Sequence, residues 1–240
     1  AYLAGLARSG QEEVVDELLR NWRDEPSLAL HTLLVAWRVG SSDERINWLI
    51  EDLEAGNLDP NAVGCLALAS WGLRSKPEPM KNLIETLANF SDLTPQITAL
   101  DLLLERSESE LDSLEPTLVA LVNNLATQKL TGMNDYVWEQ GCKLGLRRGR
   151  VKEIVKAAAT VIDSIEDFGS DEHAWEVLVE AIKLDPSEVW NAIAPFVDVR
   201  DAKSYRIVLE SQRYALVSQV PIDVIMDWVG SDNRRSIIVA

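Results

Sequence analysis

The sequence predicts an all-α fold in which about seven antiparallel helix pairs stack in a row as an α-solenoid. Apolar residues recur three and four positions apart along almost the whole chain, as they do on the buried face of an amphipathic helix. No segment of comparable length alternates apolar and polar residues, as a half-buried strand does. Prolines and glycines stand where the apolar stripes begin and end.

The stripes predict the helices in chain order. Representative stripes are Leu30, Leu33, Leu34 and Trp37, then Ile46, Leu49, Ile50 and Leu53, then Leu118, Leu121, Val122 and Leu125. We expect helices at about 2–8, 11–23, 27–39, 43–55, 60–74, 79–90, 95–107, 114–128, 134–148, 150–167, 171–184, 187–197, 201–218 and 221–230. Paired, they begin near 11, 43, 79, 114, 150, 187 and 221, which is the spacing of a two-helix repeat.

Proline and glycine set the helix boundaries. Proline lacks an N–H and is tolerated in the first helical turn, which predicts helix starts at Pro26, Pro60, Pro95, Pro116 and Pro186. Glycine readily adopts the left-handed conformation that ends many helices, as expected at Gly10, Gly40, Gly56, Gly132, Gly149, Gly169 and Gly230. Pro195 lies inside a stripe and is expected to kink or shorten its helix.

A single helix pair of this length buries too little apolar surface to offset the conformational entropy lost when it becomes ordered. Each pair must therefore pack on the next, and we expect one helical-repeat domain over residues 1–240. The chain opens without a methionine and stops within the apolar pattern of "RRSIIVA", so we expect it to be a piece of a longer protein.

The helix lengths, short connections and repeat period resemble those of the HEAT and armadillo α-solenoids. The segment Ala174–Trp190 is similar to the second helix of a tetratricopeptide repeat (TPR) running into the next repeat. Ala174, Leu178, Ala181 and Pro186 match its small, large, small and helix-starting positions. Long acidic helical arrays also resemble the scaffold or sensor arms of large bacterial signalling and antiviral defence proteins. That resemblance implies a role in protein–protein contact.

The charge balance disfavours partners that are themselves anionic. Asp and Glu number 39 against 23 Lys and Arg, which gives a net charge of -16 and a surface that repels nucleic acids and anionic lipids. The excess is concentrated in the first 60 residues, which carry 12 acidic and 5 basic side chains. No apolar run approaches the length of a membrane span, so we expect no membrane contact. Cys65 and Cys142 lie in apolar runs, as reduced thiols of a cytoplasmic protein do.

The residue types that catalysis needs are sparse, and we expect neither enzyme activity nor a cofactor or metal. No glycine-rich phosphate loop or nucleophile elbow is present. His31 is interpreted as a partly buried, hydrogen-bonded side chain. His173 follows Asp171 and Glu172, but three adjacent helical residues point in different directions. The favoured interpretation of those three is a solvated acidic helix start.

The segment Cys142–Lys156 gathers six basic residues around Gly149. Cations complement the negative end of a helix dipole, which accounts for those before Gly149, whereas cations at the following helix start are mildly unfavourable. Two interpretations stay open. In one, the basic side chains are solvated or paired within the chain; in the other, they bind an anion or an acidic partner. The candidate residues are Lys143, Arg147, Arg148, Arg150 and Lys152.

Eight tryptophans are present, and six of them belong to apolar stripes as packing residues. The other two, Trp22 and Trp48, lie beside charged neighbours and are candidates for contact with a protein partner.

These features together predict a non-catalytic scaffold or sensor region that contacts a protein partner or adjoining domains of a larger cytoplasmic protein. The alternative is a nucleic-acid-binding solenoid, of the kind found among HEAT-like proteins, that uses the basic segment Lys143–Lys156.

Overall fold

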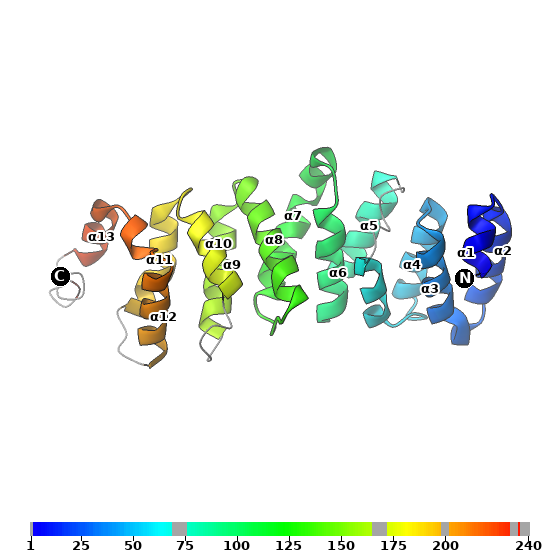
Figure 1. Cartoon of the computed structure of the whole chain (residues 1–240), viewed down its shortest axis with the longest axis horizontal. Coiled ribbons are helices and arrows are strands. Elements are labelled where there is room, and N and C mark those ends of the chain that lie inside the picture. The colour runs from blue at the N-terminus through cyan, green and yellow to red at the C-terminus, as the bar shows by residue number, and fades with distance from the viewer. Residues whose placement is uncertain (1, 69–75, 165–171, 198–201, 231–234, 236–240) are drawn as a thin grey trace. The chain divides into compact units, whose positions relative to one another are not determined.

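The computed structural model describes residues 2–68, 76–164, 172–197, 202–230 and 235, and within those ranges it is helical without any strand (Figure 1). The all-α prediction is therefore confirmed. The chain divides into two compact units, an N-terminal unit of Ala1–Leu121 and a C-terminal unit of Val122–Ala240.

In the N-terminal unit the first six helices pack on near neighbours in sequence. Its helices are α1 (Tyr2–Arg8), α2 (Glu12–Arg23), α3 (Ala29–Val39), α4 (Asp43–Glu54), α5 (Pro77–Ala88), α6 (Leu93–Leu104) and the greater part of α7 (Glu108–Leu125), with 3-10 helices at Pro26–Leu28 and Pro60–Leu68. The helices α1, α2 and α3 pack on one another, α4 packs on α5, and α5 packs on α6.

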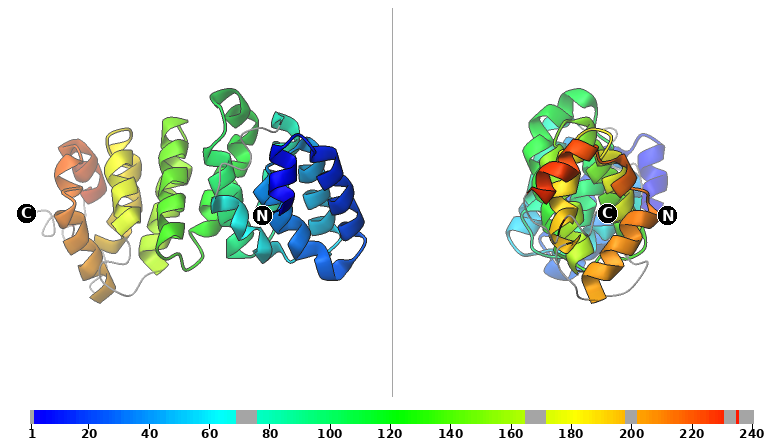
Figure 2. Two further views of the ribbon diagram at one scale, coloured as in Figure 1. Left: turned by 45° about the vertical axis from the view of Figure 1, so that its right-hand side comes forward. Right: turned by 90° about the vertical axis from the view of Figure 1, so that its left-hand side faces the viewer.

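The C-terminal unit follows the same rule. Its helices are α8 (Met133–Arg147), α9 (Val151–Ser164), α10 (Glu172–Ala181), α11 (Pro186–Val197), α12 (Ala202–Arg213) and α13 (Ile222–Val229), with a 3-10 helix at Val217–Gln219. The helix α10 packs on both α8 and α9, and α11 packs on α9, α12 and α13 (Figure 2).

The predicted stripes form much of the core, with exceptions on α3 and at Ile50 of α4, which is half-buried. Ile46, Leu49 and Leu53 are buried on α4, and all four residues of the 118–125 stripe are at most 1% exposed. On α3, Leu33 is buried, but Leu30 and Leu34 are 48% and 39% exposed. Local periodicity shows that residues share a helix face, but tertiary packing decides how much of that face is covered.

Tryptophans of the C-terminal unit pack between helices, as expected. Trp138 is buried and donates a hydrogen bond from Nε1 to the Val122 carbonyl oxygen at 3.0 Å. Trp175 stacks on Tyr214 with ring centroids 5.9 Å apart, and Trp190 meets Trp228 edge to face at 5.3 Å. These contacts join α10 to the chain that follows α12, and α11 to α13.

The prediction that glycines end helices is confirmed at five of its seven positions. Gly132 is instead the N-cap residue of α8, and Gly169 lies outside the described residues. Positive φ angles occur at Gly10, Gly40, Gly56, Gly132, Gly149 and Gly230. At Gly149, φ is 76°, and the Gly149 and Arg150 N–H groups donate to the carbonyl oxygens of Leu146 and Gly145. The left-handed residue thus closes α8 and redirects the chain into α9 two residues later.

The expected start of α7 at residue 114 is wrong, because the helix begins at Glu108. The Ser107 N–H and hydroxyl both donate to the Glu110 carboxylate, and the bond from the N–H is the glutamate half of a capping box. This local cap starts the helix upstream, and Pro116 lies inside it rather than at its first turn. In α11, Pro195 is followed by two further helical residues before the helix ends at Val197.

The expected α-helix over 60–74 is a 3-10 helix over Pro60–Leu68, and residues 69–75 lie outside the described ranges. This segment packs closely on α6. A Cβ atom at Gly64 would lie 2.9 Å from Thr94 Cγ2, so the absence of a side chain there allows the close approach.

Among the described helices, none combines the length and apolar character that crossing a membrane requires.

Candidate functional site

A polar groove runs between α4 and α5 of the N-terminal unit and has a volume of about 490 Å³. It is lined from α4 by Asn47, Ile50, Glu51 and Glu54, and from α5 and its C-cap by Asn82, Glu85, Thr86 and Asn89. On each helix these positions are i, i+3, i+4 and i+7, which is one continuous helix face. We call this surface the acidic groove.

The two sides of the acidic groove correspond residue by residue. Subtracting position numbers gives 82 − 47 = 35 and 89 − 54 = 35, and the two central positions differ by the same 35 residues. This spacing lies within the repeat period expected from the sequence. The groove is therefore lined by equivalent positions on α4 and α5.

Carboxylates and carboxamides dominate the chemistry of the acidic groove. Three glutamates line it, and only Glu51 has a recorded ion pair in the described structure, with Arg23 Nη2 at 2.8 Å. The carboxamides of Asn47, Asn82 and Asn89 each offer donors and an acceptor, as the Thr86 hydroxyl also does. Such a surface suits a ligand that is cationic and rich in exposed peptide groups.

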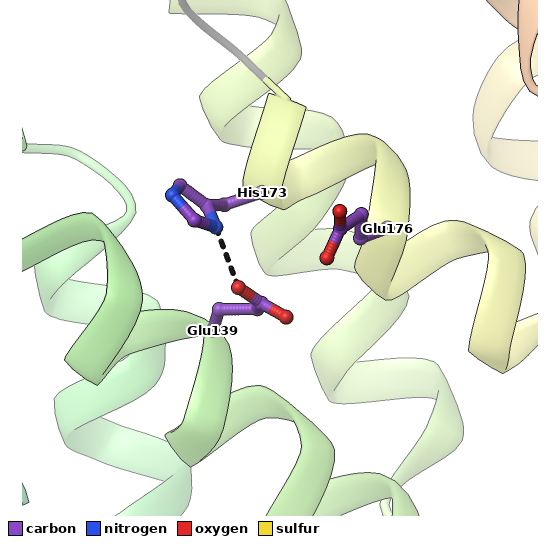
Figure 3. A group of neighbouring side chains, drawn as sticks. All are labelled: Glu139, His173 and Glu176. Atoms are coloured by element: carbon purple, nitrogen blue, oxygen red, sulfur yellow. Dashed lines mark hydrogen bonds and ion pairs between the residues drawn. The ribbon is translucent and has the colours of Figure 1, made fainter.

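A second polar cluster lies between α8 and α10 in the C-terminal unit (Figure 3). Glu139 of α8 is 3% exposed, and its Oε2 lies 2.5 Å from His173 Nδ1 of α10. The Glu139 Oε1 atom forms an ion pair with Lys143, one helical turn further along α8. Glu176 follows His173 on the same face of α10, and Glu180 lies one turn beyond it.

Hydrogen bonding keeps Glu139 ionised despite its burial. Burial raises the pKa of Glu139, but hydrogen bonds from Lys143 and His173 outweigh it and hold the pKa below its ordinary value. The pKa of Glu176 is raised by burial and by its hydrogen bond with Glu139. The pKa of Lys143 is raised, chiefly by its bond to Glu139. Among the described residues, Glu139, His173 and Glu176 form the group able to hold a metal, with their ligand atoms all within 4.8 Å of one another.

The predicted anion-binding residues do not share one environment. Lys143 is 21% exposed and lies 3.3 Å from Glu180 and 3.9 Å from Glu176, in addition to its contact with Glu139. It belongs to the cluster of Figure 3 rather than to an open basic surface. Arg147, Arg150 and Lys152 are exposed and Arg148 is half-buried around the turn from α8 to α9, and Arg150 lies 3.7 Å from Glu153. Anion binding at these four residues stays a prediction.

The two candidate contact tryptophans belong to the apolar core of the N-terminal unit. Trp48 is 9% exposed, and the guanidinium carbons of Arg20 and Arg23 each lie 5.4 Å from its ring centroid. Trp22 is half-buried and packs against the same cluster of core residues as Val15 and Leu19. Trp48 therefore offers little surface to a partner.

The two cysteines are free thiols, of which Cys142 is buried and Cys65 half-buried. Burial raises the pKa of both thiols, and Glu139 raises that of Cys142 further. A protonated buried thiol is a poor nucleophile, so Cys142 packs as a small apolar residue. His31 is exposed on α3, contrary to the expectation of partial burial.

Sequence reasoning missed both the acidic groove and the partners of His173. The signal for the groove was present, because the groove residues recur with a fixed offset of 35 on two predicted helices. His173 was grouped with its neighbours Asp171 and Glu172, whereas its contact in the structure is Glu139, 34 positions away. Asp171 lies outside the described residues.

Comparison of the chain with protein-family models, with curated proteins and with solved structures found no match.

Proposed function

We propose that this chain is a non-catalytic helical-repeat array of the solenoid type that binds a basic, extended segment of another protein or of an adjoining domain. The binding surface is the acidic groove between α4 and α5. The observation that carries the proposal is that equivalent residues of α4 and α5 form one continuous polar groove.

The offset of 35 residues supports the repeat architecture. When successive repeats share one backbone geometry, residues at equivalent positions line up along one surface of the array. A ligand that lies across several repeats then meets similar side chains at regular intervals. Asn47 and Asn82 are the same residue type at equivalent positions, and Glu54 and Asn89 each present a side-chain oxygen that accepts hydrogen bonds.

The composition of the groove supports a basic occupant. Glu51, Glu54 and Glu85 favour Lys or Arg side chains, and the overall charge of -16 disfavours anionic ones. The carboxamides favour an extended backbone, because its N–H and C=O groups are free of internal hydrogen bonds. Exposed ion pairs are individually weak, so recognition requires several contacts made together.

Fluorescence anisotropy with a labelled alternating Lys–Ser peptide tests the proposal. The peptide should bind the full chain, and a Glu–Ser peptide of equal length should not. The double variant Glu54→Lys/Glu85→Lys should weaken binding at least tenfold, since two attractive charges become repulsive. The matched control is Glu13→Lys/Glu108→Lys, which makes the same change in net charge at exposed positions of α2 and α7.

A neutral substitution separates recognition from general charge attraction. Replacing Asn82 and Asn89 with alanine leaves every charge in place and removes two carboxamides from the groove. Affinity for the Lys–Ser peptide should fall several-fold. Equal loss of binding in the groove variant and its charge-matched control would contradict the proposal. So would binding of an oligonucleotide or acidic peptide that Arg147→Glu/Lys152→Glu abolishes, because that result assigns recognition to the turn between α8 and α9.

A further inference from the structure

The polar cluster around Glu139 contains more groups able to bind a metal than the contact between Glu139 and His173 uses (Figure 3). The carboxylates of Glu139 and Glu176 and the imidazole of His173 converge from two helices. The Lys143 ammonium group lies close to Glu139, Glu176 and Glu180. We propose that Glu139, His173 and Glu176 form a binding site for a divalent transition-metal ion of the Zn²⁺ type. This site lies in the C-terminal unit and is independent of the acidic groove.

The geometry is close to what such an ion requires. Zn²⁺ takes imidazole nitrogen and carboxylate oxygen at about 2.0 to 2.2 Å, so two ligand atoms of a tetrahedral site lie about 3.4 Å apart. The ligand atoms of the three residues already lie within 4.8 Å of one another. Rotation of the Glu176 side chain, which is 45% exposed, can supply the remaining adjustment. Glu139 is held in place by its burial and by α8.

The charge of the cluster also favours a divalent cation. The carboxylates of Glu139, Glu176 and Glu180 surround the single ammonium group of Lys143, so acidic groups outnumber the basic one in the ion pairs of this cluster. Imidazole binds a metal through a ring nitrogen that carries no proton, so the ion would take Nδ1 of His173 in place of its contact with Glu139 and leave the ring proton on Nε2. A doubly positive ion offsets the acidic excess.

Lys143 is the competitor for the site, because its ammonium group contacts the same carboxylate that the metal would take. It has an alternative partner in Glu180, whose Oε1 already lies 3.3 Å from Nζ. Metal binding therefore need not leave this lysine without a counter-charge. The competition predicts that removal of the Lys143 charge tightens metal binding, whereas a purely structural ion-pair network predicts only a loss of stability.

Isothermal titration of ZnCl₂ into the chelator-treated full chain tests the site. One ion should bind per chain, and both His173→Ala and Glu176→Gln should weaken binding at least tenfold. The matched control is His31→Ala, because His31 is the other histidine of the chain and is exposed on α3. Lys143→Met should tighten Zn²⁺ binding, and far-ultraviolet dichroism before titration verifies that each variant is folded.

Three outcomes overturn the proposal. The first is the absence of Zn²⁺ binding to the wild-type chain. The second is an equal affinity of the His173→Ala and His31→Ala variants. The third is equal binding of Mg²⁺, which prefers all-oxygen ligands with retained waters and would reduce the cluster to a general acidic surface. The contrast between the two histidine variants holds whether or not Lys143→Met folds.

Discussion

Each unit of the chain buries a charged side chain between helices, and the two charges have opposite signs. In the N-terminal unit Arg45 is 3% exposed, donates from Nε to Asp16 Oδ1 at 2.8 Å and from Nη1 to the Gly40 carbonyl oxygen at 2.8 Å. In the C-terminal unit Glu139 is also 3% exposed, and it accepts from Lys143 and His173. The extent of burial is the same, but the surroundings differ.

The difference lies in how many alternative partners surround the buried charge. Arg45 meets a single recorded carboxylate, and its Nη2 has no hydrogen-bond partner within the described structure, so its bonds have no ready substitute. Glu139 has partners that also have other partners, because Lys143 forms ion pairs with Glu176 and Glu180 as well. A buried charge with fixed partners fastens helices together, whereas one with exchangeable partners leaves room for a ligand.

The largest expected effect is the loss of Arg45. Arg45→Met leaves Asp16 without its buried cation, and removing one partner of a buried pair costs about 3 to 5 kcal/mol. Urea denaturation should show that loss in the free energy of unfolding. Arg20→Met is the matched control, since Arg20 of α2 also pairs with a carboxylate across α2 and α4, that of Glu44, but is 56% exposed. Similar losses in the two variants would contradict the role given to burial.

Glu139→Gln should cost less than the Arg45 substitution. Glutamine retains the shape of the side chain and one acceptor, so one charge-assisted hydrogen bond is lost outright, and such a bond is worth about 1.5 to 3 kcal/mol in net terms. Lys143 keeps Glu180 as a counter-charge and limits the loss. The measurement is urea denaturation in the presence of a metal chelator. A loss larger than that of Arg45→Met would show that the Glu139 partners are not exchangeable.

The smallest expected effect concerns Asp101, a partly buried carboxylate on α6. Its pKa is raised by burial and then by the neighbouring carboxylate of Glu105. Because the folded-state pKa lies above the unfolded value, ionised Asp101 destabilises the fold, and this penalty grows as pH rises through that interval. Asp101→Asn should therefore raise the unfolding free energy at pH 7 by a few tenths of a kcal/mol, about the size of one like-charge helix pair.

The pH dependence of that effect distinguishes its cause. The difference between Asp101→Asn and the wild-type chain should vanish at acidic pH, where both the folded and unfolded forms carry a protonated Asp101. Thermal denaturation over a pH series measures this directly. A gain that persisted unchanged at acidic pH would have to come from packing or helix propensity rather than from charge.

Local sequence signals predicted the helices well because helix periodicity and glycine caps act over a few residues. Most predicted boundaries lie within three residues of the observed ones, as at α2, α4 and α8. The predicted start of α7 is too late because Pro116 is tolerated inside the helix, and the helix begins at the cap formed by Ser107 and Glu110. That signal was also local, and the sequence contained it.

The sites were less predictable, because they depend on which helices pack together. Glu139 and His173 meet because α8 packs on α10, with α9 between them in the chain. No local pattern specifies that contact. The acidic groove is different, since its residues follow from the repeat period once positions 35 apart are compared. Repeats thus carry long-range information that a single helix pattern does not.

Recognition of a basic segment by the acidic groove can be mapped by nuclear magnetic resonance of the labelled full chain during titration with the Lys–Ser peptide. Amide and side-chain carboxamide shifts should change at residues 47–54 of α4 and 82–89 of α5, with the largest changes at Asn47, Asn82 and Asn89. Saturable shifts confined to any other surface, or none at all at low salt, would contradict this account.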